Sequence, residues 1–86
     1  MDSLPPGRTP LYNHSLPALE AWLRGLGAQG ESGRRERWLL SRAGWSATLT
    51  LDVEELAVEW QGGGPERRFP YRLSRADVEA AILAGP

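Results

Sequence analysis

The feature that most constrains the fold of this chain is a change in the spacing of its apolar residues. From Arg34 onward, apolar and polar residues alternate with a period of two, which places successive apolar side chains on one face of a β-strand. The clearest stretch is WSATLTLDV, in which Ala47, Leu49 and Leu51 alternate with serine and threonine. The same alternation occurs in RERWLLSR, LAVEWQ and RRFPYRL. The pattern predicts four short strands, each with one apolar face.

The connections between these stretches are short, which predicts an antiparallel meander. The three joints are Ala43-Gly44, the acidic turn from Asp52 to Glu55, and the loop GGGPE. Pro70 has no backbone N–H to donate to a neighbouring strand, so we expect the last strand at an edge of the sheet.

A helix is predicted on either side of the strands. Residues 16 to 26 carry apolar side chains at helical spacing, with Ser15 as the N-cap and Gly27 at the end. A second helix is predicted over residues 75 to 84, after the capping residue Ser74. The predicted fold class is α+β: a four-stranded antiparallel meander with N- and C-terminal helices packed on one face, in the order α-β-β-β-β-α.

The length of 86 residues predicts one domain that needs most of its large apolar side chains for its core. Residues 1 to 10, with three prolines and a glycine, are predicted to form a flexible Pro-rich arm, and residues 11 to 86 a single α+β domain. The stretch GLGAQGESG is predicted to be a flexible connection. The predicted core consists of Leu19, Trp22, Leu23, Leu49, Leu51, Val58, Trp60, Phe69, Tyr71, Val78 and Ile82.

Composition excludes several chemistries. The absence of cysteine and the single histidine exclude disulfides, thiolate metal sites and sites of several histidines within one chain. The glycine-rich QGGGPE lacks the lysine of a phosphate-binding loop, and no acid–base pair stands at helix or strand spacing. We therefore expect no cofactor, no metal and no enzymatic activity. With no signal peptide and no apolar run of about 20 residues, we expect a cytoplasmic protein with no membrane partner.

The tripeptide Tyr12-Asn13-His14 directly precedes the first predicted helix. Its simplest role is structural, because such residues can start and cap a helix. Alternatively, it forms a binding corner beside the positive end of the helix. We predict that it caps the helix and also faces a partner. Trp45 is a further candidate contact if a bulge near Gly44 exposes it at the sheet edge.

The outer face of the predicted sheet could carry arginines, since Arg37, Arg68 and Arg72 alternate with apolar residues. An open sheet bearing arginine can bind RNA, although such sheets normally stack bases on exposed aromatic side chains. Here the alternation places the aromatic residues inside. The net charge of −1 gives no general attraction to nucleic acid. A solvated face is the simpler interpretation.

Three segments resemble a family of small soluble cyanobacterial proteins that is described only as a domain of unknown function. They are PLYNHSLPALEAWLRGLG, WSATLTLDVEELAVEW and YRLSRADVEAAILAGP. The similarity extends over about residues 10 to 86, and its most specific part runs from Leu-Tyr-Asn-His to Trp-Leu. Ser15 stands where the family pattern has proline. The resemblance implies an origin in an oxygenic phototroph and brings no activity, cofactor or catalytic residue with it.

Two functions remain open at this point. The first is a non-enzymatic protein-interaction module, such as an assembly or regulatory adaptor in a phototroph, with an unidentified protein partner. The alternative is an RNA- or ribosome-associated factor that binds through the arginines of the sheet face. The sequence leaves the oligomeric state open.

Overall fold

The computed structural model of the protein describes residues 5–62 and 65–85. It confirms the α+β class, with a helix before and a helix after an antiparallel sheet, but the sheet has five strands rather than four. The elements, in chain order, are the 3-10 helix η1 (Leu11–Asn13), α1 (Leu16–Gly25), β1 (Gln29–Glu31), β2 (Arg34–Arg42), β3 (Trp45–Leu51), β4 (Glu55–Trp60), β5 (Arg67–Pro70) and α2 (Arg75–Leu83).

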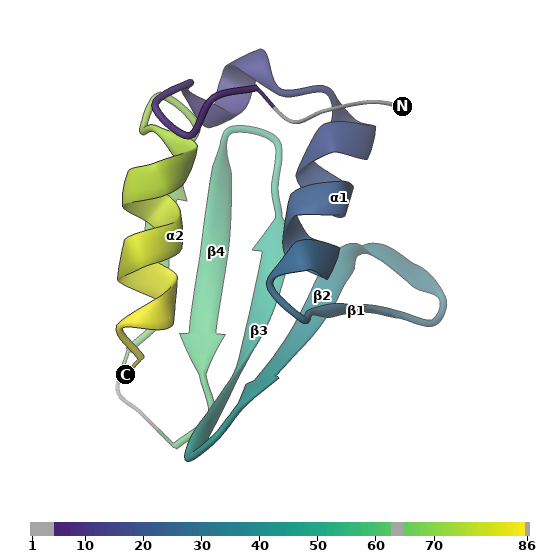
Figure 1. Ribbon diagram of the computed structural model, residues 1–86. Coiled ribbons are helices and arrows are strands. Elements are labelled where there is room, and N and C mark those ends of the chain that lie inside the picture. Colours follow the sequence, from purple (N-terminus) through teal and green to yellow (C-terminus); the bar gives the residue numbers. More distant parts are fainter. Residues whose placement is uncertain (1–4, 63–64, 86) are drawn as a thin grey trace.

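The strands form a meander in which each strand pairs with the next along the chain. Leu49 on the central strand β3 lies opposite Trp38 of β2 and Val58 of β4, so these inward residues share one level of the sheet. Both helices cover the same face of the sheet, as the period-two pattern predicts (Figure 1). β5, which ends at Pro70, is an edge strand as expected.

The additional strand β1 lies in the segment that was predicted to be a flexible connection. Gln29 pairs with Leu39 and Gly30 pairs with Trp38. The inward position of β1 is a glycine, and a Cβ built there would lie 3.7 Å from the Trp38 ring. With no side chain at that position, β1 shows no apolar alternation, although its backbone pairs with β2.

The core is formed by the inner sheet face and the two helices, and it contains most of the predicted residues. Leu51 and Tyr71 are exceptions, because both are only partly buried. Tyr71 lies in the turn after β5, which ends three residues earlier than predicted. Buried apolar residues that the predicted core omitted are Leu11, Ala28, Trp38, Leu40, Ala47 and Leu56.

Residues 5–10, which were predicted to belong to a flexible arm, lie against the start of α2. The backbone N–H of Ala76 donates to the carbonyl of Gly7 at 2.7 Å, and that of Arg75 donates to Thr9 at 3.0 Å. The first N–H groups of a helix have no partner within the helix, and this segment supplies them with carbonyl oxygens. The prediction for residues 5–10 is revised accordingly, and residues 1–4 lie outside the described part of the chain.

The predicted helix caps at Ser15 and Ser74 are confirmed. Ser15 Oγ accepts from the N–H of Ala18, and Ser74 Oγ accepts from the N–H of Asp77, each at 3.2 Å. Within the described residues, neither helix has the length and apolar composition to cross a membrane.

Candidate interaction surfaces

His14 is buried, with 7% of its surface exposed. Its Nδ1 lies 3.0 Å from the carbonyl oxygen of Pro10, which can only accept, so Nδ1 carries the proton and donates. Nε2 is also buried, and it has no hydrogen-bond partner among the described residues. The ring therefore holds the η1 turn together and does not lie where a partner could contact it. The structure favours the structural role of His14 over a role in recognition.

The other two residues of the tripeptide are exposed, and none of the three caps α1. The only side-chain hydrogen bond at the start of α1 in the described part of the chain comes from Ser15. Tyr12 and Asn13 belong to the 3-10 helix, which turns the chain before α1 begins. The predicted capping role was wrong because the tripeptide forms its own turn. That Tyr12 and Asn13, whose side chains are exposed, face a partner remains a prediction.

Three of the four large apolar side chains that are exposed among the described residues belong to elements at one end of the molecule, namely η1, the start of α1 and the β3–β4 turn. Tyr12 is 62% exposed, Leu16 58% and Val53 88%. We call these three residues the apical patch. Figure 1 shows that the β3–β4 turn lies at the same end of the molecule as η1 and the start of α1. Helical spacing puts Leu16 on the same stripe as the buried Leu19 and Leu23, but Leu16 occupies the first position of α1 and stays exposed.

Tyr71 connects the two parts of the apical patch. Its hydroxyl donates to the carbonyl of Asp52 at 2.5 Å, and its backbone N–H donates to the carbonyl of Glu54 at 3.2 Å. Its own carbonyl accepts from the N–H of Tyr12 at 2.9 Å. The residues that flank Val53 are thus tied through Tyr71 to Tyr12.

The environment of Tyr71 keeps its side chain neutral. Burial raises its pKa to about 12 because it disfavours the phenolate, and the carboxylates of Asp52 and Glu55 raise it further in the same direction. The hydroxyl is therefore a hydrogen-bond donor throughout the physiological range of pH.

The rim of the apical patch is acidic. Asp52 and Glu54 are exposed in the β3–β4 turn, and Asp52 Oδ1 accepts from the N–H of Val53 at 2.8 Å. That bond belongs to a local turn and holds Val53 at the tip. The patch therefore combines apolar side chains with carboxylates at one edge.

Trp45 lies at the opposite end of β3 from the apical patch, about 20 Å along the strand. It is half-buried against the core, and a Cβ at Gly85 would come within 3.0 Å of its indole Nε1. The bulge that would have exposed Trp45 is absent, since pairing from Arg37 to Arg42 is continuous with β3. The Trp45 side chain therefore lies on the inward face of β3, next to the end of α2. It is not part of the same surface as the tripeptide.

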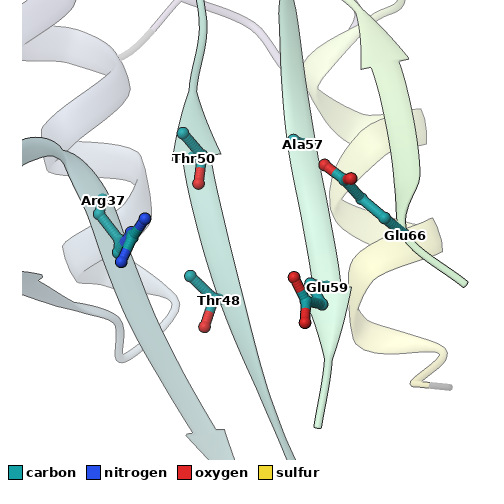
Figure 2. Close-up of a pocket in the computed structure, with 6 residues that line it drawn as sticks. All are labelled: Arg37, Thr48, Thr50, Ala57, Glu59 and Glu66. Carbon is teal, nitrogen blue, oxygen red and sulfur yellow. The ribbon is translucent and has the colours of Figure 1, made fainter. Parts of the chain in front are cut away.

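The sheet face away from the helices carries a shallow hollow of about 250 Å³. Figure 2 shows Thr48 and Thr50 of β3 in its middle, with Arg37 on one side and the carboxylates of Glu59 and Glu66 on the other. Ala57 is a buried part of the floor. We call this surface the open sheet face.

The candidate RNA-binding arginines do not form one basic surface. Arg37 lies 3.7 Å from Glu31, and Arg68 lies 2.7 Å from Glu55 and 3.5 Å from Glu66. The hydrogen bond to Glu55 and the charge of Glu66 raise the pKa of the Arg68 guanidinium. Arg72 lies in the turn between β5 and α2, away from the strands. The negative charges of these glutamates thus offset the positive charges of Arg37 and Arg68 on the sheet.

Comparison with protein families identifies a match over residues 26–85, which is most of the chain. The matching family is DUF3143, described as a protein of unknown function. The chain belongs to the DUF3143 family. The match covers all five strands and α2, whereas the Leu-Tyr-Asn-His segment and the whole of α1 precede it. Neither the curated proteins nor the solved structures include a match to this DUF3143 chain.

Among residues 5–62 and 65–85, no three metal-ligating side chains come together. The threonines and charged residues of the open sheet face line one hollow, whereas the three apolar residues of the apical patch lie on elements that share one end of the molecule. Val53 was the residue most clearly missed. A valine within an acidic turn, outside any strand pairing, is the sequence signal that could have identified it.

Proposed function

We propose that this DUF3143 protein is a non-enzymatic protein-interaction module whose partner binds the apical patch. The observation that supports this most is the exposure of Tyr12, Leu16 and Val53 on elements that share one end of the molecule. Exposed apolar side chains that gather on a small protein commonly mark a contact surface, and tyrosine is enriched among residues that dominate binding energy. The hydrogen bonds of Tyr71 link Tyr12 to the turn that carries Val53.

The acidic rim indicates the chemistry of the partner. Asp52 and Glu54 stand beside Val53 and outside any ion pair among the described residues. A partner that buries an apolar side chain on the patch and carries lysine or arginine next to it would complement both features. The resemblance to cyanobacterial proteins supports a role as an assembly or regulatory adaptor in the cytoplasm of an oxygenic phototroph.

Affinity capture from a cyanobacterial lysate tests the proposal. The full chain is compared with the double variant Tyr12→Ala/Val53→Ser, and with Leu39→Ser as the matched control. Leu39 is also apolar and 47% exposed, but it lies on the open sheet face. We expect the double variant to lose the captured protein and the control to retain it, with circular dichroism showing that both are folded.

The same experiment distinguishes the RNA alternative. Phosphate contacts make binding fall steeply with ionic strength, while an apolar contact is much less affected. Recovery of nuclease-sensitive RNA that is lost at high salt, and unchanged in Tyr12→Ala/Val53→Ser, would contradict the proposal.

A further inference from the structure

The charges on the open sheet face are arranged asymmetrically about the central strand. Arg37 lies on β2, on one side of β3, and Glu59 and Glu66 lie on the other side, on β4 and just before β5 (Figure 2). The two threonines of β3 lie between them. Arg37, whose Nε lies 3.7 Å from Glu31, marks what we call the cationic side of the face, and Glu59 and Glu66 mark the anionic side, with a neutral strip between them.

We propose that this face binds the same face of a second copy of the chain, with a two-fold axis parallel to β3. Rotation about such an axis exchanges the two sides of the sheet while keeping each residue at its level along the strands. It therefore brings β2 of one copy over β4 of the other. The cationic side of each copy then faces the anionic side of its neighbour.

The strand register identifies the contact. Arg37 pairs with Thr50, and Thr50 pairs with Ala57, so these three residues share one level across the sheet. Arg37 of the second copy consequently falls over Ala57, whose small side chain leaves the hollow open. Glu59 lies two residues further along β4 on the same face, and Glu66 lines the hollow as well. The rotation produces this contact twice.

The charges around Ala57 favour an incoming guanidinium. Arg68 is opposite Ala57 on β5, but Glu55 and Glu66 already compensate it. Counting Glu55, Glu59 and Glu66 against Arg68 gives three carboxylates to one guanidinium, an excess of two negative charges. An arginine from a second copy reduces this excess.

Arg37 is suited to provide that contact. Its distance to Glu31 is 3.7 Å, longer than a hydrogen bond, and its Nε has no hydrogen-bond partner among the described residues. The side chain is partly exposed, so its terminal nitrogens are available to a carboxylate of the second copy. Arg68, in contrast, is engaged with Glu55 at 2.7 Å.

The alternative face-to-face arrangement is disfavoured by the same charges. A two-fold axis perpendicular to the strands would keep each strand over itself, so Arg37 would lie over β2 of the second copy and away from the carboxylates of Glu59 and Glu66. With the axis along β3, the threonines of the two copies face each other. Hydroxyl groups both donate and accept hydrogen bonds, so this strip is self-complementary.

Sedimentation equilibrium of the full chain, from about 10 μM to about 1 mM, tests the proposal in the range of weak association. We expect a reversible dimer that weakens as salt is added. Arg37→Glu should weaken it about tenfold or more, as should Glu59→Arg/Glu66→Arg. The triple variant that combines these changes should restore it. Arg72→Glu, an equal change of charge in the β5–α2 turn, should leave the dimer intact.

A second experiment leaves the charges unchanged. The chain has no cysteine, so Thr50→Cys and Ala80→Cys each provide a single thiol, one beside the proposed axis and one on the exposed face of α2. Packed sheets lie about 10 Å apart, so a bismaleimide of similar span should join two Thr50→Cys chains and not two Ala80→Cys chains. A monomer at every concentration, a dimer indifferent to Arg37→Glu, or equal cross-linking of both variants would overturn the proposal.

Discussion

At the scale of single residues, Tyr71 determines how the apical end of the molecule is held together. Its hydroxyl donates to the Asp52 carbonyl, and its backbone bonds both to the β3–β4 turn and to η1. Tyr71→Phe removes only the hydroxyl bond, so we expect the free energy of unfolding at pH 7 to fall by about 1 kcal/mol. Denaturant unfolding followed by tryptophan fluorescence measures this change. Tyr12→Phe, in which the altered side chain is exposed, is the control and should have little effect.

The pH dependence of stability follows from the same residue. In the folded chain the pKa of Tyr71 is about 12, above its ordinary value of 10.0. A raised pKa favours the protonated form in the folded state, so this contribution is complete below pH 10 and is lost as pH rises through 12. The chain has no lysine and no cysteine, whose ordinary pKa values lie in or close to this interval, so the contribution of Tyr71 is not obscured by them. Stability should decline there in the native protein and decline less in Tyr71→Phe.

His14 acts through burial and one hydrogen bond. We expect His14→Ala to lower the free energy of unfolding by about 2 kcal/mol, because it leaves a cavity and removes one of the two hydrogen bonds to the carbonyl of Pro10, which keeps the bond from the N–H of Asn13. Asn13→Ala, at the exposed neighbouring position, should change stability by less than about 0.5 kcal/mol. Capture of the partner should survive His14→Ala at temperatures where the variant is folded. A folded variant that keeps its stability and loses its partner would show that His14 takes part in recognition.

At the scale of elements, the two helices are linked directly. The indole Nε1 of Trp22 on α1 donates to Oε1 of Glu79 on α2 at 2.8 Å, and Trp22 is otherwise buried in the core. Glu79→Ala should cost about 1 to 3 kcal/mol, since it leaves the indole N–H without an acceptor, whereas Glu79→Gln keeps an acceptor and should cost less. Trp22→Ala also removes a large core side chain and should cost about 3 to 5 kcal/mol. Thermal unfolding of the three variants checks this order.

The N-terminal segment belongs structurally to α2. Its carbonyls at Gly7 and Thr9 accept from the first two N–H groups of that helix. We expect a chain that begins at Pro10 to lose about 1 to 3 kcal/mol of stability, because those N–H groups lose their partners. A chain that begins at Pro5 retains both carbonyls and is the matched control. Equal stability of the two truncated chains, measured by urea unfolding, would contradict the assignment.

At the scale of the whole molecule, placing both helices on one face separates two surfaces that can act independently. The apical patch lies at one end of the sheet, and the open sheet face is the side that the helices leave uncovered (Figure 1). Because the two surfaces share no residue, we expect Tyr12→Ala/Val53→Ser to leave the dimer dissociation constant unchanged. Likewise, Arg37→Glu should still capture the partner. Loss of both properties in either variant would show that the surfaces are coupled.

Most of the architecture was predictable because it follows from local patterns. Alternation with a period of two predicted β2 to β5, and helical spacing with serine caps predicted α1 and α2. β1 could not be predicted in this way, because its inward residue is Gly30 and its pairing depends on the Trp38 ring of another strand. The order of strands followed from the short connections, and the edge position of the last strand followed from the missing backbone N–H of Pro70.

The candidate sites were less predictable, because exposure depends on where elements end. Tyr12 and Asn13 were singled out from the sequence and are exposed, whereas His14 in the same tripeptide is buried. Exposure of Trp45 depended on a bulge near Gly44, which is absent, and Trp45 lies against Gly85, forty residues later in the chain. Leu16 and Val53 are surface residues because Leu16 opens α1 and Val53 lies in the β3–β4 turn, outside the strand pairing.

Local sequence patterns were sufficient to predict the fold class, the helix caps and the inward face of each long strand, since these depend on neighbours within a few residues. They could not predict that residues 5–10 cap α2, that Tyr71 joins two distant turns, or that Arg37 and Glu59 lie on opposite sides of β3. Each of these depends on contacts between segments far apart in the chain. Such contacts form only when the helices and the sheet have packed together, so they cannot be predicted from the pattern of neighbouring residues.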